Sequence, residues 1–155
     1  MPERKTILTV HLNAPKSKVY HTLLDRNLIS KWKVPDDMRC IVHDYQAKEK
    51  GTFRISLEYT DINEVGKTIN NIDTYHGYFK KLKPYDEIIE IDEFETDHND
   101  MQGLMTITYT LIESKGGSDL TIVHDNIPIG VSLEDNQIGW EIALSKLTSL
   151  IEMDK

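Results

Sequence analysis

Residues 53–60 read Phe-Arg-Ile-Ser-Leu-Glu-Tyr-Thr, with an apolar side chain at every second position and a polar one between. Because successive side chains of a β-strand point to opposite faces, this alternation predicts a strand with one buried face and one face in water. An antiparallel sheet tolerates burial on one face, whereas a parallel sheet is covered on both. The stretch therefore indicates an antiparallel sheet that needs a cover on one side.

The same period of two recurs over most of the chain. Residues 6–13 alternate in this way, and further alternating segments fill residues 38–126. Turn residues such as Lys50-Gly51, Pro84 and Gly116-Gly117 separate these segments. We therefore predict seven strands, over residues 6–13, 39–45, 53–60, 68–82, 87–95, 103–113 and 118–125.

Three other segments repeat their apolar residues at helical spacing. Apolar residues four positions apart predict short helices over residues 15–25 and 27–33. A long helix is predicted after Ser132, where Ser-Leu-Glu-Asp is similar to a capping box, because a broad apolar stripe continues to Ile151. This helix is the only predicted element long enough to cover the sheet. The chain is therefore predicted to be a single α+β domain over residues 1–155, with a concave space between sheet and helix.

The composition excludes several classes of protein. Eighteen Lys and Arg against 26 Asp and Glu give a net charge of -8, which disfavours nucleic acid as a ligand. The lone cysteine, Cys40, cannot form an internal disulfide, and no apolar run matches a signal peptide or a membrane span. We therefore expect a cytoplasmic protein. Because no phosphate-binding or nucleotide motif occurs, no cofactor is expected.

Seven groups of short motifs follow one another along nearly the whole chain. They are Asn13-Ala14-Pro15, residues 28–38, residues 51–57, His76-Gly77-Tyr78-Phe79, residues 94–97, residues 126–130 and Gly139-Trp140. In this order they resemble the START-like (SRPBCC) helix-grip proteins, in the branch related to the activator of the ninety-kilodalton heat-shock protein ATPase. The resemblance implies a seven-stranded curved antiparallel sheet that grips the C-terminal helix in its concave face, often with a cavity. It implies no assigned reaction for most bacterial members, and fold alone does not fix function.

Two positions depart from the pattern of this family. Lys33 stands where many relatives have a second aromatic residue after the tryptophan, and it is expected to make the mouth of the cavity more polar. Asn136 stands where close relatives often carry histidine, which removes a candidate acid or base near the start of the last helix.

The candidate ligand-binding residues are side chains that would surround the inside of the grip. Strand parity places Tyr59 on the buried face of residues 53–59, and it places His124 on the same face as Leu120 and Ile122. The cavity candidates are Trp32, Tyr59, Phe79, Tyr109, His124, Trp140 and Leu144. Each of them is equally compatible with ordinary core packing, because large apolar side chains are mostly buried.

Other ionisable residues match no known site. The six histidines lack metal-binding spacing, and the acidic run over residues 93–100 lacks the ligand offsets of a calcium loop, so it is interpreted as a solvated face. Glu58 and Asp61 flank Tyr59, but parity directs Glu58 to water. Cys40 has no base partner in sequence and is interpreted as core filling. We therefore predict no metal site and no catalytic residue.

The sequence is compatible with three functions. The preferred hypothesis is non-catalytic binding of a small apolar or amphipathic molecule between the sheet and the C-terminal helix. The second is a chaperone-modulating interaction domain, which the family name implies. The third is an enzyme of the cyclase or hydrolase kind, which needs an ionisable pair in the cavity, and parity offers only His124 with Tyr59 or Tyr109. A monomer and a homodimer are equally compatible with the sequence.

Overall fold

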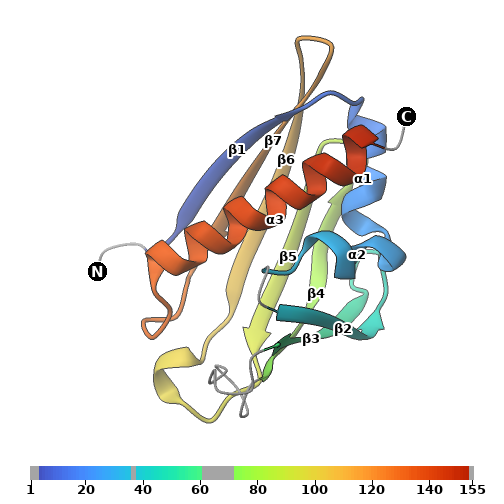
Figure 1. The fold of residues 1–155 in the computed structure, drawn as a ribbon. Coiled ribbons are helices and arrows are strands. Elements are labelled where there is room, and N and C mark those ends of the chain that lie inside the picture. Colours follow the sequence, from blue (N-terminus) through green and yellow to red (C-terminus); the bar gives the residue numbers. More distant parts are fainter. Residues whose placement is uncertain (1–3, 36–37, 61–71, 154–155) are drawn as a thin grey trace.

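The computed structural model describes residues 4–35, 38–60 and 72–153. In these ranges the chain forms three α-helices, a seven-stranded sheet and one short 3-10 helix (Figure 1). The helices are α1 (Lys16–Leu24), α2 (Arg26–Trp32) and α3 (Leu133–Met153), and the 3-10 helix η1 spans Asn99–Met101. The strands are β1 (Thr6–Leu12), β2 (Met38–Tyr45), β3 (Thr52–Tyr59), β4 (Ile72–Lys83), β5 (Glu87–Phe94), β6 (Met105–Ser114) and β7 (Gly117–Asp125).

The predicted strands and helices are confirmed, with ends that differ by a few residues. The strand predicted over 68–82 corresponds to β4, and its residues 68–71 lie outside the described residues. Ser132 caps α3 as the sequence indicates, because its Oγ accepts a hydrogen bond from the backbone N–H of Asp135 at 3.2 Å. η1 was not predicted, since three residues are too short to show a helical period.

The strands are antiparallel throughout, in the order β1-β7-β6-β5-β4-β3-β2. The register fixes which side chains share the inner face, because residues opposite one another point the same way. Thus Glu90 of β5 lies between Phe79 of β4 and Ile107 of β6. Bulges interrupt the register of β2 and β4, and such irregularities bend strands and increase their twist.

Different helices cover the two sides of the concave face. α3 lies lengthwise in it and packs against β1, whereas α2 packs against β2 at the other edge (Figure 1). The buried stripe of α3 consists of Trp140, Ala143, Leu144, Leu147 and Ile151. The architecture is therefore the α+β helix grip that the sequence predicts, with α1 and α2 as a second cover.

Gly77 occupies a point of β4 where the inner face has no room for a side chain. It lies opposite Phe53 in the register. A Cβ at this position would come within 1.8 Å of the Ile91 carbonyl oxygen and 2.8 Å of the Phe53 ring. The carbonyl oxygen belongs to the sheet backbone and cannot move aside as a flexible side chain would.

We predict that Gly77→Ala lowers the free energy of unfolding by about 3 kcal/mol, at the upper end of the usual cost of overpacking. Gly139→Ala is the matched control, because Gly139 lies in α3 with open space around it. The control should raise the free energy of unfolding by about 0.5–1 kcal/mol. Urea unfolding followed by tryptophan fluorescence measures both, and equal effects would contradict the steric explanation.

Candidate functional site

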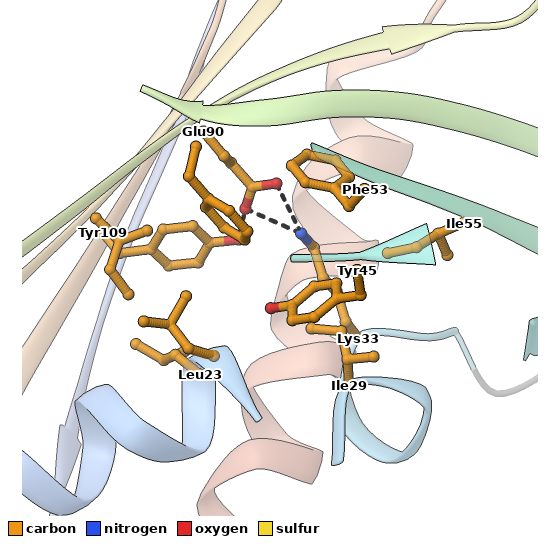
Figure 2. A pocket seen from close by; sticks show the side chains of 11 residues that line it. Leu23, Ile29, Lys33, Tyr45, Phe53, Ile55, Glu90 and Tyr109 are labelled. Carbon is orange, nitrogen blue, oxygen red and sulfur yellow. Dashed lines mark hydrogen bonds and ion pairs between the residues drawn. The ribbon is translucent and has the colours of Figure 1, made fainter. Parts of the chain in front are cut away.

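A group of buried polar side chains meets on the inner face of the sheet. Lys33 Nζ lies 3.0 Å from Glu90 Oε1 and 3.2 Å from Glu90 Oε2, and the two side chains are 12% and 4% exposed (Figure 2). The Tyr109 hydroxyl donates a hydrogen bond to Glu90 Oε1, and Asp92 is hydrogen-bonded to Glu90 as well. We call Lys33, Glu90, Asp92 and Tyr109 the Lys33–Glu90 cluster.

Strand geometry and a helix end bring this cluster together. Glu90 and Asp92 are two residues apart on β5, so both point to the inner face. Lys33 directly follows the last residue of α2, and its backbone N–H still donates to the Ile29 carbonyl at 3.0 Å. The end of α2 therefore directs the Lys33 side chain under the helix toward β5.

The charges of the cluster depend on one another. Burial by itself would lower the pKa of Lys33, but the carboxylates of Glu90 and Asp92 outweigh burial and raise it. Burial by itself would raise the pKa of Glu90, but the Lys33 ammonium outweighs burial and lowers it. Burial, followed by the Glu90 carboxylate, holds the pKa of Asp92 well above its ordinary value. The surroundings therefore favour an ammonium on Lys33, a carboxylate on Glu90 and the protonated form of Asp92.

The cluster leaves acceptor capacity unused. Within the described residues, Asp92 Oδ1 has no hydrogen-bond partner, although the Asp92 side chain is buried. Buried polar atoms in folded proteins nearly always have a partner, so an atom that lacks one is a candidate contact for a ligand or a water molecule.

A small cavity adjoins the cluster. It offers about 10 Å³ to the centre of a water-sized sphere, which is enough for about one water molecule. Lys33, Glu90 and Tyr109 form its polar part (Figure 2). The other lining residues are apolar or aromatic, namely Leu23, Leu24, Ile29, Tyr45, Phe53, Ile55, Phe79 and Ile88.

The position of this cavity differs from the sequence-based expectation. The expected space lies between the sheet and the C-terminal helix, whereas the observed lining comes from α1, α2 and the sheet, with no residue of α3. The physical reason is that α3 packs closely on the sheet, with Leu147 and Ile151 almost fully buried. The shorter α1 and α2 close the remaining part of the concave face less tightly.

The residues predicted for the site have different surroundings. Phe79 and Tyr109 line the cavity, while Trp32 and Leu144 are buried outside its lining. Tyr59 lies partly exposed at the end of β3. Trp140 does not line the cavity, but its ring centroid lies 5.9 Å from Lys33 Nζ. Glu90 and Asp92 were missed by the sequence analysis, and Lys33 was noted only for its departure from the family pattern.

His124 belongs to a separate network that attaches α3 to the sheet. Its Nδ1 accepts a hydrogen bond from Trp140 Nε1 at 3.0 Å and lies 3.2 Å from Asn136 Nδ2, so Nε2 carries the proton toward Met105 Sδ. Asn136 Oδ1 in turn accepts a hydrogen bond from the Thr6 hydroxyl at 2.7 Å. Burial, reinforced by Lys33 and opposed by Glu90, lowers the pKa of His124 to about 4. His124 is thus a neutral residue whose ring nitrogens already have partners.

The remaining ionisable candidates lie on outer surfaces or in the core. Glu58 pairs with Arg39, while Asp61 lies outside the described residues. Glu95 of the acidic run binds Arg54 at 2.9 Å. Burial raises the pKa of Cys40 to about 11, which makes it a poor nucleophile at neutral pH.

The described ranges contain neither a cluster of metal ligands nor a membrane-spanning helix. In residues 4–35, 38–60 and 72–153, no three His, Cys, Asp or Glu side chains gather in a way that could hold a metal ion. None of the helices in these ranges has the length and hydropathy needed to cross a membrane.

The fold has clear relatives among solved structures. Protein CV1439 from Chromobacterium violaceum is 28% identical, with a TM-score of 0.86 over 96% of this chain and 97% of that one. A protein from Staphylococcus epidermidis, 19% identical, has a TM-score of 0.77 over 100% of this chain and 93% of that one. Protein Ms6760 from Mycobacterium smegmatis, 16% identical, has a TM-score of 0.73 over 95% and 90%. No curated protein matches the chain.

A curved antiparallel sheet around a long C-terminal helix, with a small interior cavity, defines a START-like helix-grip protein. The family model described as "Activator of Hsp90 ATPase homolog 1-like protein" matches residues 13–152. The chain therefore belongs to the family of Activator of Hsp90 ATPase homolog 1-like proteins.

We predict that the buried neutral His124 makes the protein less stable in acid. The unfolded chain binds a proton at His124 as the pH falls through about 6.5, whereas the folded protein does so only near pH 4. The free energy of unfolding that neutral His124 contributes is therefore fully present above pH 6.5. It falls by about 3 kcal/mol as the pH decreases from 6.5 to 4. Urea unfolding at a series of pH values measures this loss.

The variant His124→Gln should flatten the pH profile between pH 6.5 and 4, because it removes the titrating group. The matched control His98→Gln replaces an exposed histidine and should keep the wild-type profile. A wild-type slope in His124→Gln would show that other groups cause the acid sensitivity.

Proposed function

We propose that the protein binds a small amphipathic molecule between the inner face of the sheet and helices α1 and α2. The ligand's polar end would lie at the Lys33–Glu90 cluster, and its apolar part would lie among Leu23, Ile55 and Phe79. The observation that carries this proposal is an apolar cavity bordered by a buried ion pair, next to a buried carboxyl oxygen that has no partner in the described part of the chain. Binding sites for small molecules typically combine apolar walls with a few convergent polar groups.

Entry of a ligand requires the covering helices to move. The cavity has room for about one water molecule, so a larger occupant displaces α1 and α2 outward from the sheet. These helices have 9 and 7 residues, whereas α3 has 21. Isolated helices this short have little stability of their own and depend on packing. The side covered by α1 and α2 is therefore the part of the grip that opens most readily.

We predict that amphipathic molecules with a chain of six to ten carbons raise the melting temperature. A ligand at a hundred times its Kd adds about 2.7 kcal/mol of stability, which for a chain of this length corresponds to roughly 5–10 °C. The test is thermal unfolding with matched alkyl alcohols, carboxylates and amines. Absence of a shift with all three head groups would contradict the proposal.

A pair of variants locates the binding site. Ile55→Phe fills the cavity and should reduce the ligand-induced shift by at least half. Ile122→Phe is the matched control, because both isoleucines are 1% exposed on the inner face but Ile122 does not line the cavity. Both variants are expected to cost about 1–3 kcal/mol through overpacking, so stability alone does not distinguish them. An equal reduction in both variants would place binding elsewhere.

Acid–base catalysis is a second candidate function, and the Glu90–Asp92 pair favours it. Their pKa values move in opposite directions, which gives one base and one acid side by side next to the Tyr109 hydroxyl. This pair differs from the pairing of His124 with a tyrosine that strand parity offered, and Glu90 is the member of the pair that lines the cavity. Proton exchange of a simple ketone in D₂O, followed by NMR, tests this function. A rate of proton exchange that is unchanged in Glu90→Gln would contradict acid–base catalysis.

The chaperone partner that the family name implies stays a prediction.

A further inference from the structure

We propose that the side chains around the Lys33 ammonium form a recognition site for an alkylammonium group of the ligand, and that Lys33 occupies this site as an internal substitute. This inference rests on the proposed function and specifies the chemistry of the ligand's polar end. We call the site the ammonium cage and define it as Tyr75, Tyr109, Trp140, Glu90 and Asp92.

The geometry of the cage is that of a cation site. Lys33 Nζ lies over the rings of Tyr75, Tyr109 and Trp140, at 5.8, 5.9 and 5.9 Å from their centroids. Aromatic faces attract cations at such distances, and the attraction is stronger where water is excluded. Glu90 supplies the counter-charge through both carboxylate oxygens. The walls come from β4, β5, β6 and α3, so none of them lies on α2.

The charge balance favours a cation over an anion as the ligand's polar group. The cage contains two carboxyl groups and one ammonium, and Glu90 already neutralises Lys33. An added anion would face the Glu90 carboxylate and the acidic Asp92. An added ammonium would instead give Asp92 Oδ1 the hydrogen-bond donor that it lacks among the described residues. Lys33 itself bonds to Glu90 and leaves this oxygen unpaired, so it uses the cage incompletely.

Lys33 is placed to leave the cage without disturbing its walls. It lies immediately beyond the end of α2, and its long, unbranched side chain lines the cavity from the helix side. At 12% its side chain is more exposed than the 4% of Glu90, so Lys33 approaches from the side nearer to solvent. Rotation of this side chain, or outward movement of α2, opens the cage to a ligand from the direction that the proposed function requires.

Calorimetric titration of the full chain with three probes of equal chain length tests the inference: n-hexylammonium, 1-hexanol and hexanoate. We expect the wild-type protein to bind hexylammonium at least about tenfold more tightly than hexanol. Lys33→Ala should bind hexylammonium about tenfold more tightly still, because the competing ammonium is absent. Lys31→Ala is the matched control, since Lys31 is an exposed residue of α2, and it should behave as wild type.

A second variant keeps the test decisive if Lys33→Ala fails to fold. Asparagine has nearly the same size and shape as the protonated carboxyl group that burial favours at Asp92, so the fold should tolerate Asp92→Asn. It should weaken hexylammonium binding about tenfold, because asparagine cannot ionise beside the added ammonium as a carboxyl group can, and leave hexanol binding unchanged.

Each contrary outcome overturns the inference in a recognisable way. If the wild-type protein binds hexanol or hexanoate as tightly as hexylammonium, the ammonium cage is wrong while the proposed ligand binding stands. If hexylammonium binds to Asp92→Asn and to Lys33→Ala as it does to the wild-type protein, the amine lies elsewhere. The ammonium cage is then wrong, while the proposed ligand binding stands. If hexylammonium binds to Lys33→Ala but not to the wild-type protein, Lys33 occupies the cage permanently, and the inference that a ligand replaces it is wrong. Absence of binding for all three probes in the wild-type protein and in Lys33→Ala contradicts the proposed function as well.

Discussion

The inner face of this protein depends on a buried pair of opposite charges, the Lys33 ammonium and the Glu90 carboxylate. Either charge alone in that position would be costly, because each has lost most of its water. The pair therefore links the end of α2 to β5, a central strand, and Tyr109 and Asp92 add hydrogen bonds to the same carboxylate. Such a pair contributes little net stability compared with apolar packing.

Most of the fold could be predicted from the sequence because its elements carry strong, regular patterns. The alternation in residues 53–59 is visible because Phe53 and Ile55 are buried on the inner face, whereas Arg54 is exposed on the other. The stripe of α3 is visible because Trp140, Leu144 and Leu147 recur at helical spacing and are all buried. Register bulges and the separate cover formed by α1 and α2 have no comparable signal, since they depend on contacts between distant segments.

The candidate site was harder to predict, because β5 breaks the rule that relates polarity to exposure. Each face of β5 carries two apolar and two acidic residues, so hydropathy alone does not decide whether Glu90 and Asp92 point inward or to water. Both are buried, and only pairing with Lys33, 57 residues away in sequence, makes the inward orientation of Glu90 acceptable. The available signal was Lys33 itself, a charged residue directly after the buried Trp32 in a predicted helix. His124 was correctly placed on the buried face, but its surroundings make it a structural residue with satisfied hydrogen bonds.

The two covers of the concave face separate the attachment of the long helix from the lining of the cavity. The Trp140–His124–Asn136 network fixes the long helix at one side, whereas the cavity lies under two short helices at the other. Substitutions of Leu23, Leu24 and Ile29 can therefore reshape the cavity without touching the hydrogen bonds that attach the long helix. The energetic cost of such changes falls instead on the packing of the two short helices, because Leu23 and Ile29 are themselves buried.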